Sequence, residues 1–217
     1  MRGLFITFEG IEGVGKSTQI QILADKLRQL ECKIVVLREP GGTPVGEEIR
    51  HTLKHSAANT QMAPETELLL MNASRAQLVR EVIRPALDRG EIVLCDRFSD
   101  STIAYQGYGR GLDLRTVKSI VEFAVGGLSP DLSLLLSLPI SLSEARRAER
   151  AESSALERDR FEEEDSAFFA RAAEGYGKLA AAEPKRIMVI DGAKSIEAVH
   201  LAIWAVVEPM IRDELHF

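Results

Sequence analysis

One motif near the N-terminus constrains the fold of this chain more than any other feature. Residues 10–17, Gly-Ile-Glu-Gly-Val-Gly-Lys-Ser, match the pattern Gly-x4-Gly-Lys-Ser/Thr. The apolar run 4–8 before it is typical of a strand, and residues 18–30 after it carry apolar side chains near helical spacing. A glycine loop between a strand and a helix directs backbone N–H groups and a helix N-terminus at phosphate. The alternative, a glycine-rich turn with an unrelated lysine, is disfavoured by this context.

The motif also predicts which residues hold a nucleoside triphosphate and its metal ion. Lys16 is expected to reach the outer phosphates, and the Ser17 hydroxyl is expected to ligate Mg²⁺. The predicted nucleotide-binding residues of the loop are Gly10, Glu12, Gly13, Val14, Gly15, Lys16, Ser17 and Thr18.

The composition argues against a nucleic-acid-binding or membrane-spanning protein. The 217 residues carry a formal net charge of −6, whereas nucleic-acid-binding proteins usually carry a basic excess. No apolar run approaches the length that crosses a bilayer, and only Arg2 is charged before the first strand. Cys32 and Cys95 lie far apart, and Cys95 ends an apolar run, which favours a buried thiol over a disulfide or metal ligand. We therefore expect a cytoplasmic protein.

Segments typical of strands and helices alternate along the chain, which predicts a parallel α/β sheet. Further strands are expected at residues 33–37, 91–95, 132–136 and 186–190, and helices at 46–54, 64–88, 114–125 and 195–211. Pro85 is expected to kink or shorten the long helix near its end. Ser141 and Glu144 have the spacing of a capping box, which predicts another helix that starts at Ser141. The predicted fold is one domain, 1–217, with a five-stranded parallel sheet flanked by helices.

The segment 144–165 differs from the rest of the chain in its density of charge. It contains nine acidic residues and five arginines, namely Arg146, Arg147, Arg150, Arg158 and Arg160. We interpret the segment as a lid whose arginines close over phosphates and exclude water. The alternative is a solvated helical face with i,i+4 ion pairs.

Chemically active side chains follow the first three predicted strands, where ligands of parallel α/β sheets gather. The first strand leads to Glu9 and the glycine loop, the second to residues 38–41, and the third to Asp96 and Arg97. Asp96 is expected to reach Mg²⁺ directly or through water, and Arg97 to bridge two phosphates; the alternative is a structural Asp96–Arg97 ion pair. This set suits phosphoryl transfer, which depends mainly on positioning and on charge neutralisation.

Several motifs together resemble the bacterial thymidylate kinases. Besides the glycine loop, they are Arg-Glu-Pro-Gly-Gly-Thr at 38–43, Asp-Arg at 96–97, Ser-Thr-Ile-Ala-Tyr-Gln-Gly at 101–107 and Gly-Arg-Gly at 109–111. The resemblance covers nearly the whole chain. It implies a P-loop fold, usually homodimeric, that transfers the γ-phosphate of ATP to dTMP with Mg²⁺.

The resemblance also implies roles at the acceptor site. Two arginines would hold the acceptor phosphate, a third would read the pyrimidine edge, and Glu12 would approach the sugar 3′-hydroxyl. The residues expected to bind dTMP are Glu12, Pro40, Arg50, Met71, Arg75, Arg97, Ser101, Tyr105 and Gln106. The alternatives are a surface arginine for Arg50 and ordinary helix packing for Tyr105 and Gln106.

Two positions distinguish this chain within the resemblance. Met71 stands where the family usually has an aromatic residue that stacks on thymine. A thioether against a ring contributes ~0.3–1.5 kcal/mol, which is comparable in size to the stacking of two rings. Gly13 stands where some members carry a basic residue, so the chain resembles the members whose catalytic arginine lies in the lid. Arg150 is expected to be this catalytic arginine, with Arg158 as the alternative. Arg150 and Arg146, which lies one turn earlier, are both expected to bind ATP.

Two other functions are weighed against this interpretation. One is a kinase for a different nucleoside monophosphate, such as guanylate, adenylate or uridylate. The other is a P-loop switch or partitioning ATPase, whose output is binding. The chain has no Asn-Lys-x-Asp guanine-reading motif, and an arginine-rich lid suits transfer between two nucleotides better than slow hydrolysis.

Overall fold

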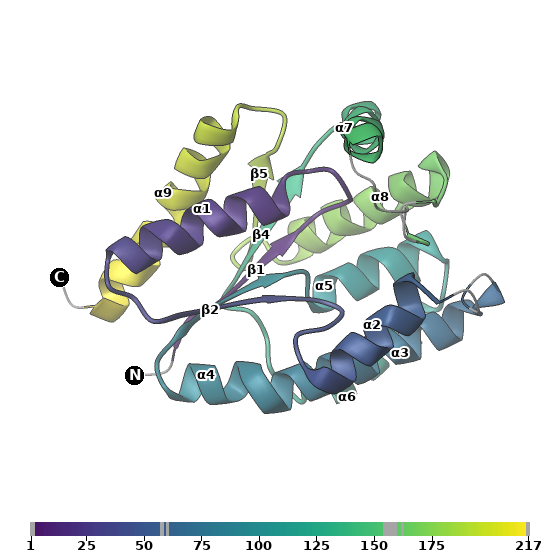
Figure 1. Ribbon diagram of the computed structural model, residues 1–217, viewed down its shortest axis with the longest axis horizontal. Helices are drawn as coiled ribbons and strands as arrows, with labels where there is room; N and C mark the ends of the chain where they lie inside the picture. Colours follow the sequence, from purple (N-terminus) through teal and green to yellow (C-terminus); the bar gives the residue numbers. More distant parts are fainter. Residues whose placement is uncertain (1–2, 57–58, 60, 154–159, 162, 216–217) are drawn as a thin grey trace.

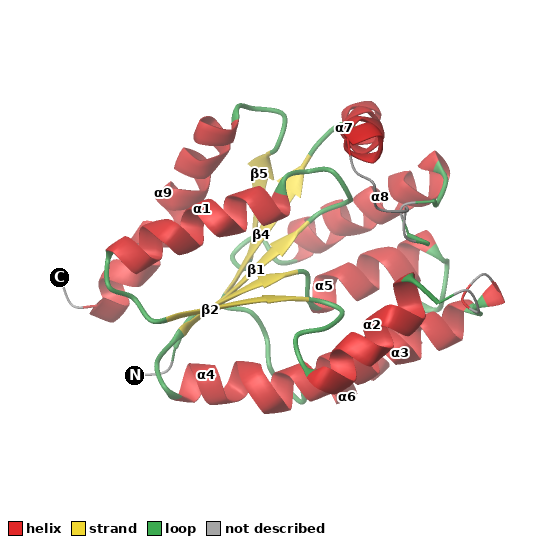
Figure 2. Ribbon diagram, in the orientation of Figure 1, coloured by secondary structure: helices red, strands yellow, loops and turns green. Residues whose placement is uncertain are grey.

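A parallel sheet of five strands forms the centre of the molecule (Figures 1 and 2). The computed structural model describes residues 3–56, 59, 61–153, 160–161 and 163–215. The strands are β1 (Phe5–Glu9), β2 (Ile34–Arg38), β3 (Ile92–Asp96), β4 (Leu132–Ser137) and β5 (Ile187–Asp191), in the order β2-β3-β1-β4-β5. Each boundary lies within one residue of the prediction, so the predicted fold class is confirmed.

The central position of β1 explains its composition. All five of its residues are buried, because β3 and β4 pair with it on both edges and helices cover both faces. Phe5 packs edge-on against Phe98 at a centroid distance of 4.9 Å on one face, whereas Ile6 packs into the cluster that contains helix α1 on the other. The register pairs Phe8 with Asp96, so the ends of β1 and β3 lie side by side.

Helices cover the two faces of the sheet. Figure 1 shows α1 (Lys16–Gln29) and α9 (Ile196–Leu215) on one side, and α4 (Arg84–Asp88), α6 (Leu114–Val125) and α8 (Ser166–Ala182) on the other. The short helix α2 (Pro44–Lys54) packs against α3 (Pro64–Leu78). No helix among the described residues is long and apolar enough to cross a membrane.

The long helix predicted at 64–88 is one continuous helical segment with an irregular middle. A π-helical turn, η2 (Val79–Ile83), connects α3 to α4 and ends two residues before Pro85. Proline lacks an N–H and clashes with the preceding turn, which accounts for the changed bonding pattern there. The helix is not shortened at Pro85, because α4 continues to Asp88. A second π-helical segment, η3 (Ile103–Gly109), follows α5 (Ser99–Thr102) and carries Tyr105 and Gln106.

The predicted lid contains most of α7 (Ile140–Ser153) and leads into α8. The capping box predicted at Ser141 is wrong, because α7 begins at Ile140, directly after Pro139. Glu144 instead accepts a hydrogen bond from the Ser166 hydroxyl at the start of α8. Residues 154–159 and 162, among them Arg158, lie outside the described residues.

Candidate active site

The glycine loop wraps around the amine of Lys16. Lys16 Nζ donates to the carbonyl oxygens of Gly10 at 3.0 Å and Ile11 at 2.9 Å. Gly10 has a φ of 129°, and a Cβ there would lie 2.4 Å from the Leu136 carbonyl oxygen. Burial, together with the positive charge of Arg97, lowers the pKa of Lys16 to about 8. The loop therefore holds a cation at the point where α1 begins.

Helix α7 packs directly on this loop. Ser143 Oγ donates to the Glu12 carbonyl oxygen at 2.7 Å, and a Cβ at Gly13 would lie 3.0 Å from the Ser143 carbonyl oxygen. The loop thus leaves no room for a basic side chain at Gly13, which agrees with the absence of charge there. Arg146 donates to the Gly192 carbonyl oxygen at 3.2 Å. Arg150 lies one turn further along α7, but its side chain lies outside the described part of the chain.

Asp96 and Arg97 point to different partners. Ser17 Oγ donates to Asp96 Oδ2 at 2.9 Å, whereas Arg97 Nη2 donates to Glu12 Oε1 at 2.7 Å. The alternative of a structural ion pair between Asp96 and Arg97 is therefore wrong.

Ser17 and Asp96 form an oxygen-rich pair that suits Mg²⁺. Mg²⁺ prefers oxygen ligands and is typically bound by one or two carboxylates together with water and substrate phosphates. Among the described residues no group of three His, Cys, Asp or Glu side chains converges on a metal position. The pair fits an ion that takes its remaining ligands from a nucleotide and water.

The backbone of Arg97 is strained. Its φ of 72° is in the left-handed region, which costs a non-glycine residue about 1–3 kcal/mol. Hydrogen bonds hold the backbone in place: Arg97 N donates to the Phe8 carbonyl oxygen at 3.0 Å, and Phe98 N donates to Glu9 Oε1 at 2.8 Å. The guanidinium also donates to the Gly10 carbonyl oxygen at 2.9 Å and the Tyr105 hydroxyl at 3.1 Å. The turn fixes one direction for this guanidinium.

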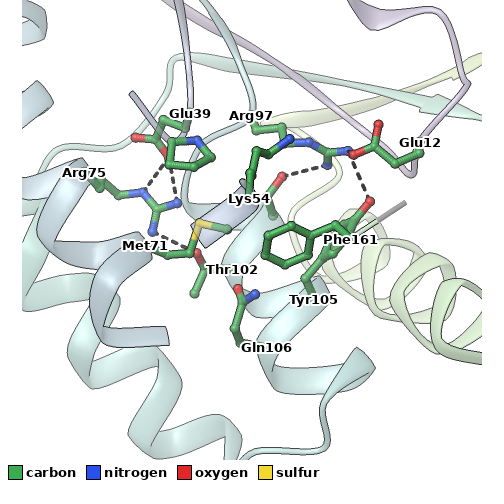
Figure 3. A pocket seen from close by; sticks show the side chains of 12 residues that line it. Glu12, Glu39, Lys54, Met71, Arg75, Arg97, Thr102, Tyr105, Gln106 and Phe161 are labelled. Atoms are coloured by element: carbon green, nitrogen blue, oxygen red, sulfur yellow. Dashed lines mark hydrogen bonds and ion pairs between the residues drawn. The ribbon is translucent and has the colours of Figure 1, made fainter. Parts of the chain in front are cut away.

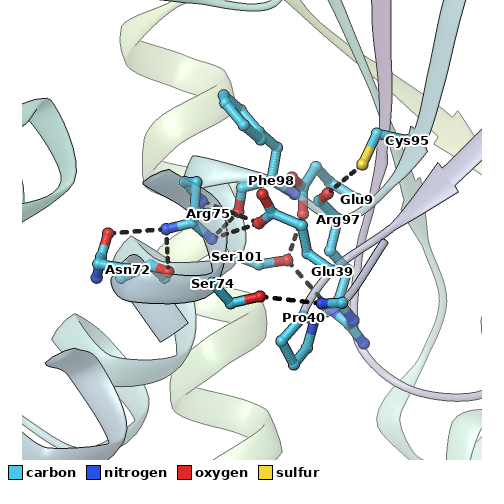
Figure 4. A network of polar contacts seen from close by, with 12 residues as sticks. Glu9, Glu39, Pro40, Asn72, Ser74, Arg75, Cys95, Arg97, Phe98 and Ser101 are labelled. Carbon is cyan, nitrogen blue, oxygen red and sulfur yellow. Dashed lines mark hydrogen bonds and ion pairs between the residues drawn. The ribbon is translucent and has the colours of Figure 1, made fainter. Parts of the chain in front are cut away.

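A buried polar network supports Arg97 (Figure 4). Ser101 Oγ and the Tyr176 hydroxyl donate to Glu9 Oε2 at 2.6 and 3.0 Å. Burial, with a contribution from the charge of Asp100, raises the pKa of Glu9 to about 7. The position of Glu9 directly after the first strand predicts its place at this edge but no role for it. Tyr176 comes from α8, and no motif in the sequence marks it.

A cavity lies between α3, η3 and the end of β3 (Figure 3). It is lined by eight of the nine residues predicted to bind dTMP; Arg50 instead lines the adjoining hollow at the glycine loop, with Lys16 and Arg97. The alternatives of ordinary packing for Tyr105 and Gln106 and of a surface role for Arg50 are thus disfavoured. Further lining residues, to which the sequence motifs assign no role, are Glu39, Lys54, Thr102 and Phe161.

Arg75 is held rigidly at the edge of this cavity. It is almost fully buried, and Nε and Nη2 donate to Glu39 Oε2 at 2.9 and 2.7 Å. The remaining N–H groups donate to the Phe98 carbonyl oxygen, Asn72 Oδ1 and Thr102 Oγ1 at 2.9–3.0 Å (Figures 3 and 4). All five N–H groups of the guanidinium are therefore engaged. Because Thr102 accepts from Arg75, its own hydroxyl hydrogen is available to a ligand.

Two further hollows adjoin the glycine loop. The central one carries the arginines of the site and is lined by Glu12, Gly13, Gly15, Lys16, Ser17, Thr18, Arg38, Glu39, Arg50, Lys54, Asp96, Arg97 and Arg146. The outer one lies between the loop, α7 and the start of α9, and is lined by Gly13, Val14, Gly15, Thr18, Gln19, Arg146, Gly192, Lys194, Ile196 and Val199. The site thus has one cavity on each side of a basic centre.

A P-loop with a cavity on either side of an arginine-lined centre defines the P-loop nucleoside monophosphate kinases. Comparison with known proteins narrows this class. The family model described as thymidylate kinase matches residues 8–203. The chain belongs to the thymidylate kinase family.

Individual relatives agree with this assignment over nearly the whole chain. The chain is 50% identical to the thymidylate kinase of Geobacter sulfurreducens over 202 residues, which are 93% of this chain and 94% of the relative. It is 48% identical to that of Kosmotoga olearia over 197 residues, 91% of each chain. The crystal structure of thymidylate kinase from Ehrlichia chaffeensis superposes with a TM-score of 0.77 at 32% identity, over 96% of this chain and 99% of the other.

Proposed function

We propose that this protein transfers the γ-phosphoryl group of ATP to dTMP and produces dTDP and ADP. The observation that carries the proposal is the position of Arg97, which lines both the basic centre at the P-loop and the cavity that holds Met71, Arg75 and Gln106. A single guanidinium thereby faces the phosphates of two nucleotides, one on each side.

The donor nucleotide lies along the P-loop in this proposal. Backbone N–H groups of the loop and Lys16 bind its outer phosphates, and the outer hollow beside Lys194 and Ile196 takes its base. Ser17 and Asp96 would hold Mg²⁺. The bound ion supplies positive charge that neutralises the phosphate oxygens.

The acceptor nucleotide occupies the cavity between α3 and η3. Arg50 and Arg97 bind its phosphate, since two guanidiniums match phosphate oxygens in fork geometry. Glu12, whose carboxylate is paired with Arg97 at 2.7 Å, accepts a hydrogen bond from the sugar 3′-hydroxyl. Pro40 and Met71 pack against the base, and Arg75, Thr102 and Gln106 face its polar edge.

The reaction then proceeds by direct in-line transfer without a covalent intermediate. The protein binds and orients two phosphates, excludes water and stabilises the charge that spreads over the migrating group. Lys16 and Arg97 supply two fixed cations. Arg146 lines the basic centre from α7, and we keep Arg150 as the proposed catalytic arginine of the lid.

The test is ADP release from ATP and Mg²⁺ with no acceptor, and then separately with dTMP, dUMP, UMP, GMP and AMP. A large stimulation by dTMP alone supports the proposal. Stimulation by another monophosphate keeps the kinase mechanism and overturns the substrate. Release that is indifferent to every acceptor overturns the kinase mechanism in favour of a P-loop ATPase switch.

The proposed active form is a homodimer built through α3 and α6. These helices pack against each other, and each carries a large exposed apolar side chain, Leu69 at 56% and Phe123 at 88% exposure. A two-fold axis through this side would bury both side chains against their counterparts in a second copy.

A further inference from the structure

A buried carboxylate just outside the base cavity has no role in the mechanism above. Glu67, in the first turn of α3, is fully buried but does not line the cavity. Burial of a charge is costly unless the group is paired and hydrogen-bonded. Glu67 Oε2 accepts from Arg110 Nη2 at 2.9 Å and from Arg160 Nη2. These two guanidiniums, from the end of η3 and from the lid segment, compensate its charge.

A third donor to Glu67 is the cavity residue Gln106. Gln106 Nε2 donates to Glu67 Oε1 at 2.8 Å, and Gln106 is itself buried. An ionised carboxylate only accepts hydrogen bonds, so the atom of the Gln106 amide that faces it must be the NH₂ group. The carboxylate therefore fixes which way the amide is turned.

The orientation of this amide decides what the cavity offers to a base. Figure 3 shows the Gln106 amide reaching into the cavity, with its oxygen on the side of Thr102. The polar atom presented to a ligand is then an acceptor. Thymine and uracil carry a ring N–H between their two carbonyl groups, whereas cytosine carries an acceptor nitrogen at that ring position. An amide oxygen bonds the first kind of ring and repels the second.

We propose that Glu67 is a positioning residue that sets base specificity by locking the Gln106 amide with its oxygen toward the ligand. The inference rests on the proposed function, because it takes this cavity as the acceptor-base pocket. A neutral amide at position 67 presents either an oxygen or an NH₂ group. The Gln106 amide is then free to turn by 180° and offer a donor.

The test compares kcat/KM for dTMP and dCMP in the wild-type enzyme and in Glu67→Gln. We expect the dTMP-to-dCMP ratio to fall about 10-fold or more, which corresponds to about 1.4 kcal/mol, since leaving a buried polar group mispaired is costly. The change should come mainly from KM, with kcat for dTMP nearly unchanged. Asp100→Asn is the matched control, because Asp100 is also buried and bonded to an arginine, Arg186, at 2.7 Å. It should lower the Tm and leave the ratio unchanged.

A second variant keeps the test independent of the folding of Glu67→Gln. Gln106→Leu removes both donor and acceptor, so it should lower the same ratio, and adding Glu67→Gln to it should lower the ratio no further. An unchanged ratio in Gln106→Leu, or in a folded Glu67→Gln, would overturn the role of Glu67. Wild-type enzyme that does not use dTMP would instead overturn the proposed function.

Discussion

Arg97 shows how much of this site depends on the conformation of one residue. Its left-handed backbone turns the guanidinium away from the adjacent Asp96 and toward Glu12 and Tyr105. The strain persists because Phe8 and Glu9, both on the central strand, bind the backbone on either side. Asp96 is left to face Ser17, so two adjacent residues point to different parts of the site.

Met71 offers a prediction at the same scale. Met71→Phe should tighten dTMP binding about threefold, because an aromatic ring stacks on a base in a better-defined geometry than a flexible thioether. Isothermal titration calorimetry measures the Kd for dTMP. The Kd for ATP serves as the internal control, because Met71 lines the cavity between α3 and η3 but neither of the two hollows at the P-loop. A weaker or unaltered Kd for dTMP would show that the side chain does not cover the base.

Glu9 makes stability depend on pH. Its pKa is about 7 in the folded protein against 4.5 for a free side chain, chiefly because of burial. Folding therefore takes up a proton between these values, and the ionised carboxylate destabilises the fold as pH rises from about 4.5 to 7. Glu9→Gln should remove this loss, up to about 3 kcal/mol between pH 5 and 8. Urea unfolding of both proteins at the two pH values measures this loss as a difference in the free energy of unfolding. The same pH dependence of that free energy in wild type and Glu9→Gln would contradict the prediction.

At the scale of secondary structure, the contact between α7 and the P-loop has a testable consequence. Gly13→Ala places a Cβ 3.0 Å from the Ser143 carbonyl oxygen at a φ of 76°. We expect α7 to shift and kcat to fall at least 10-fold. The left-handed backbone of the new alanine should also lower the free energy of unfolding by ~1–2 kcal/mol. Gly127→Ala, with a φ of 78° and no atom near its Cβ, isolates the strain. Equal kcat in the two variants would show that the contact has no catalytic effect.

Helix α7 also carries three of the five arginines assigned to the lid, Arg146, Arg147 and Arg150. Arg150→Ala should lower kcat about 100-fold with little change in the Kd for dTMP, because the charge it neutralises develops in the transition state. Steady-state kinetics and calorimetry separate the two effects. Arg115→Ala is a suitable control, since Arg115 is 97% exposed in its side chain on α6. Unchanged turnover in Arg150→Ala would move the role to Arg146 or Arg158.

For the whole molecule, the proposed dimer gives a direct prediction. Phe123→Asp places a charge on the proposed α3–α6 interface and should convert the dimer to a monomer in sedimentation velocity experiments. Leu201→Asp is the matched control, because Leu201 is 64% exposed on α9, away from this surface. A wild-type protein that is already monomeric, or a Phe123→Asp protein that stays dimeric, would reject this interface.

The cytoplasmic location and the absence of nucleic-acid binding stay predictions from the sequence.

Local sequence determined the fold class and much of the site. The strands are short apolar runs, and they alternate along the chain with segments of helical periodicity. This pattern predicts all five strands to within one residue of their observed boundaries. The P-loop was predictable because its glycines, Lys16 and Ser17 act through backbone geometry within eight neighbouring residues. The capping box at Ser141 was wrong because its local pattern competes with Pro139, after which α7 begins directly.

Tertiary structure alone decided the contacts that shape the pocket. Glu9 meets Tyr176 across 167 positions of sequence, and Arg160 reaches Glu67 across 93. No periodicity or local motif encodes such pairs, since each depends on how α3, η3 and α8 pack against the sheet. The sequence thus specified which chemical groups stand at the ends of the strands. The packing of helices from distant segments decided which of those groups are buried, how they are turned and what they can recognise.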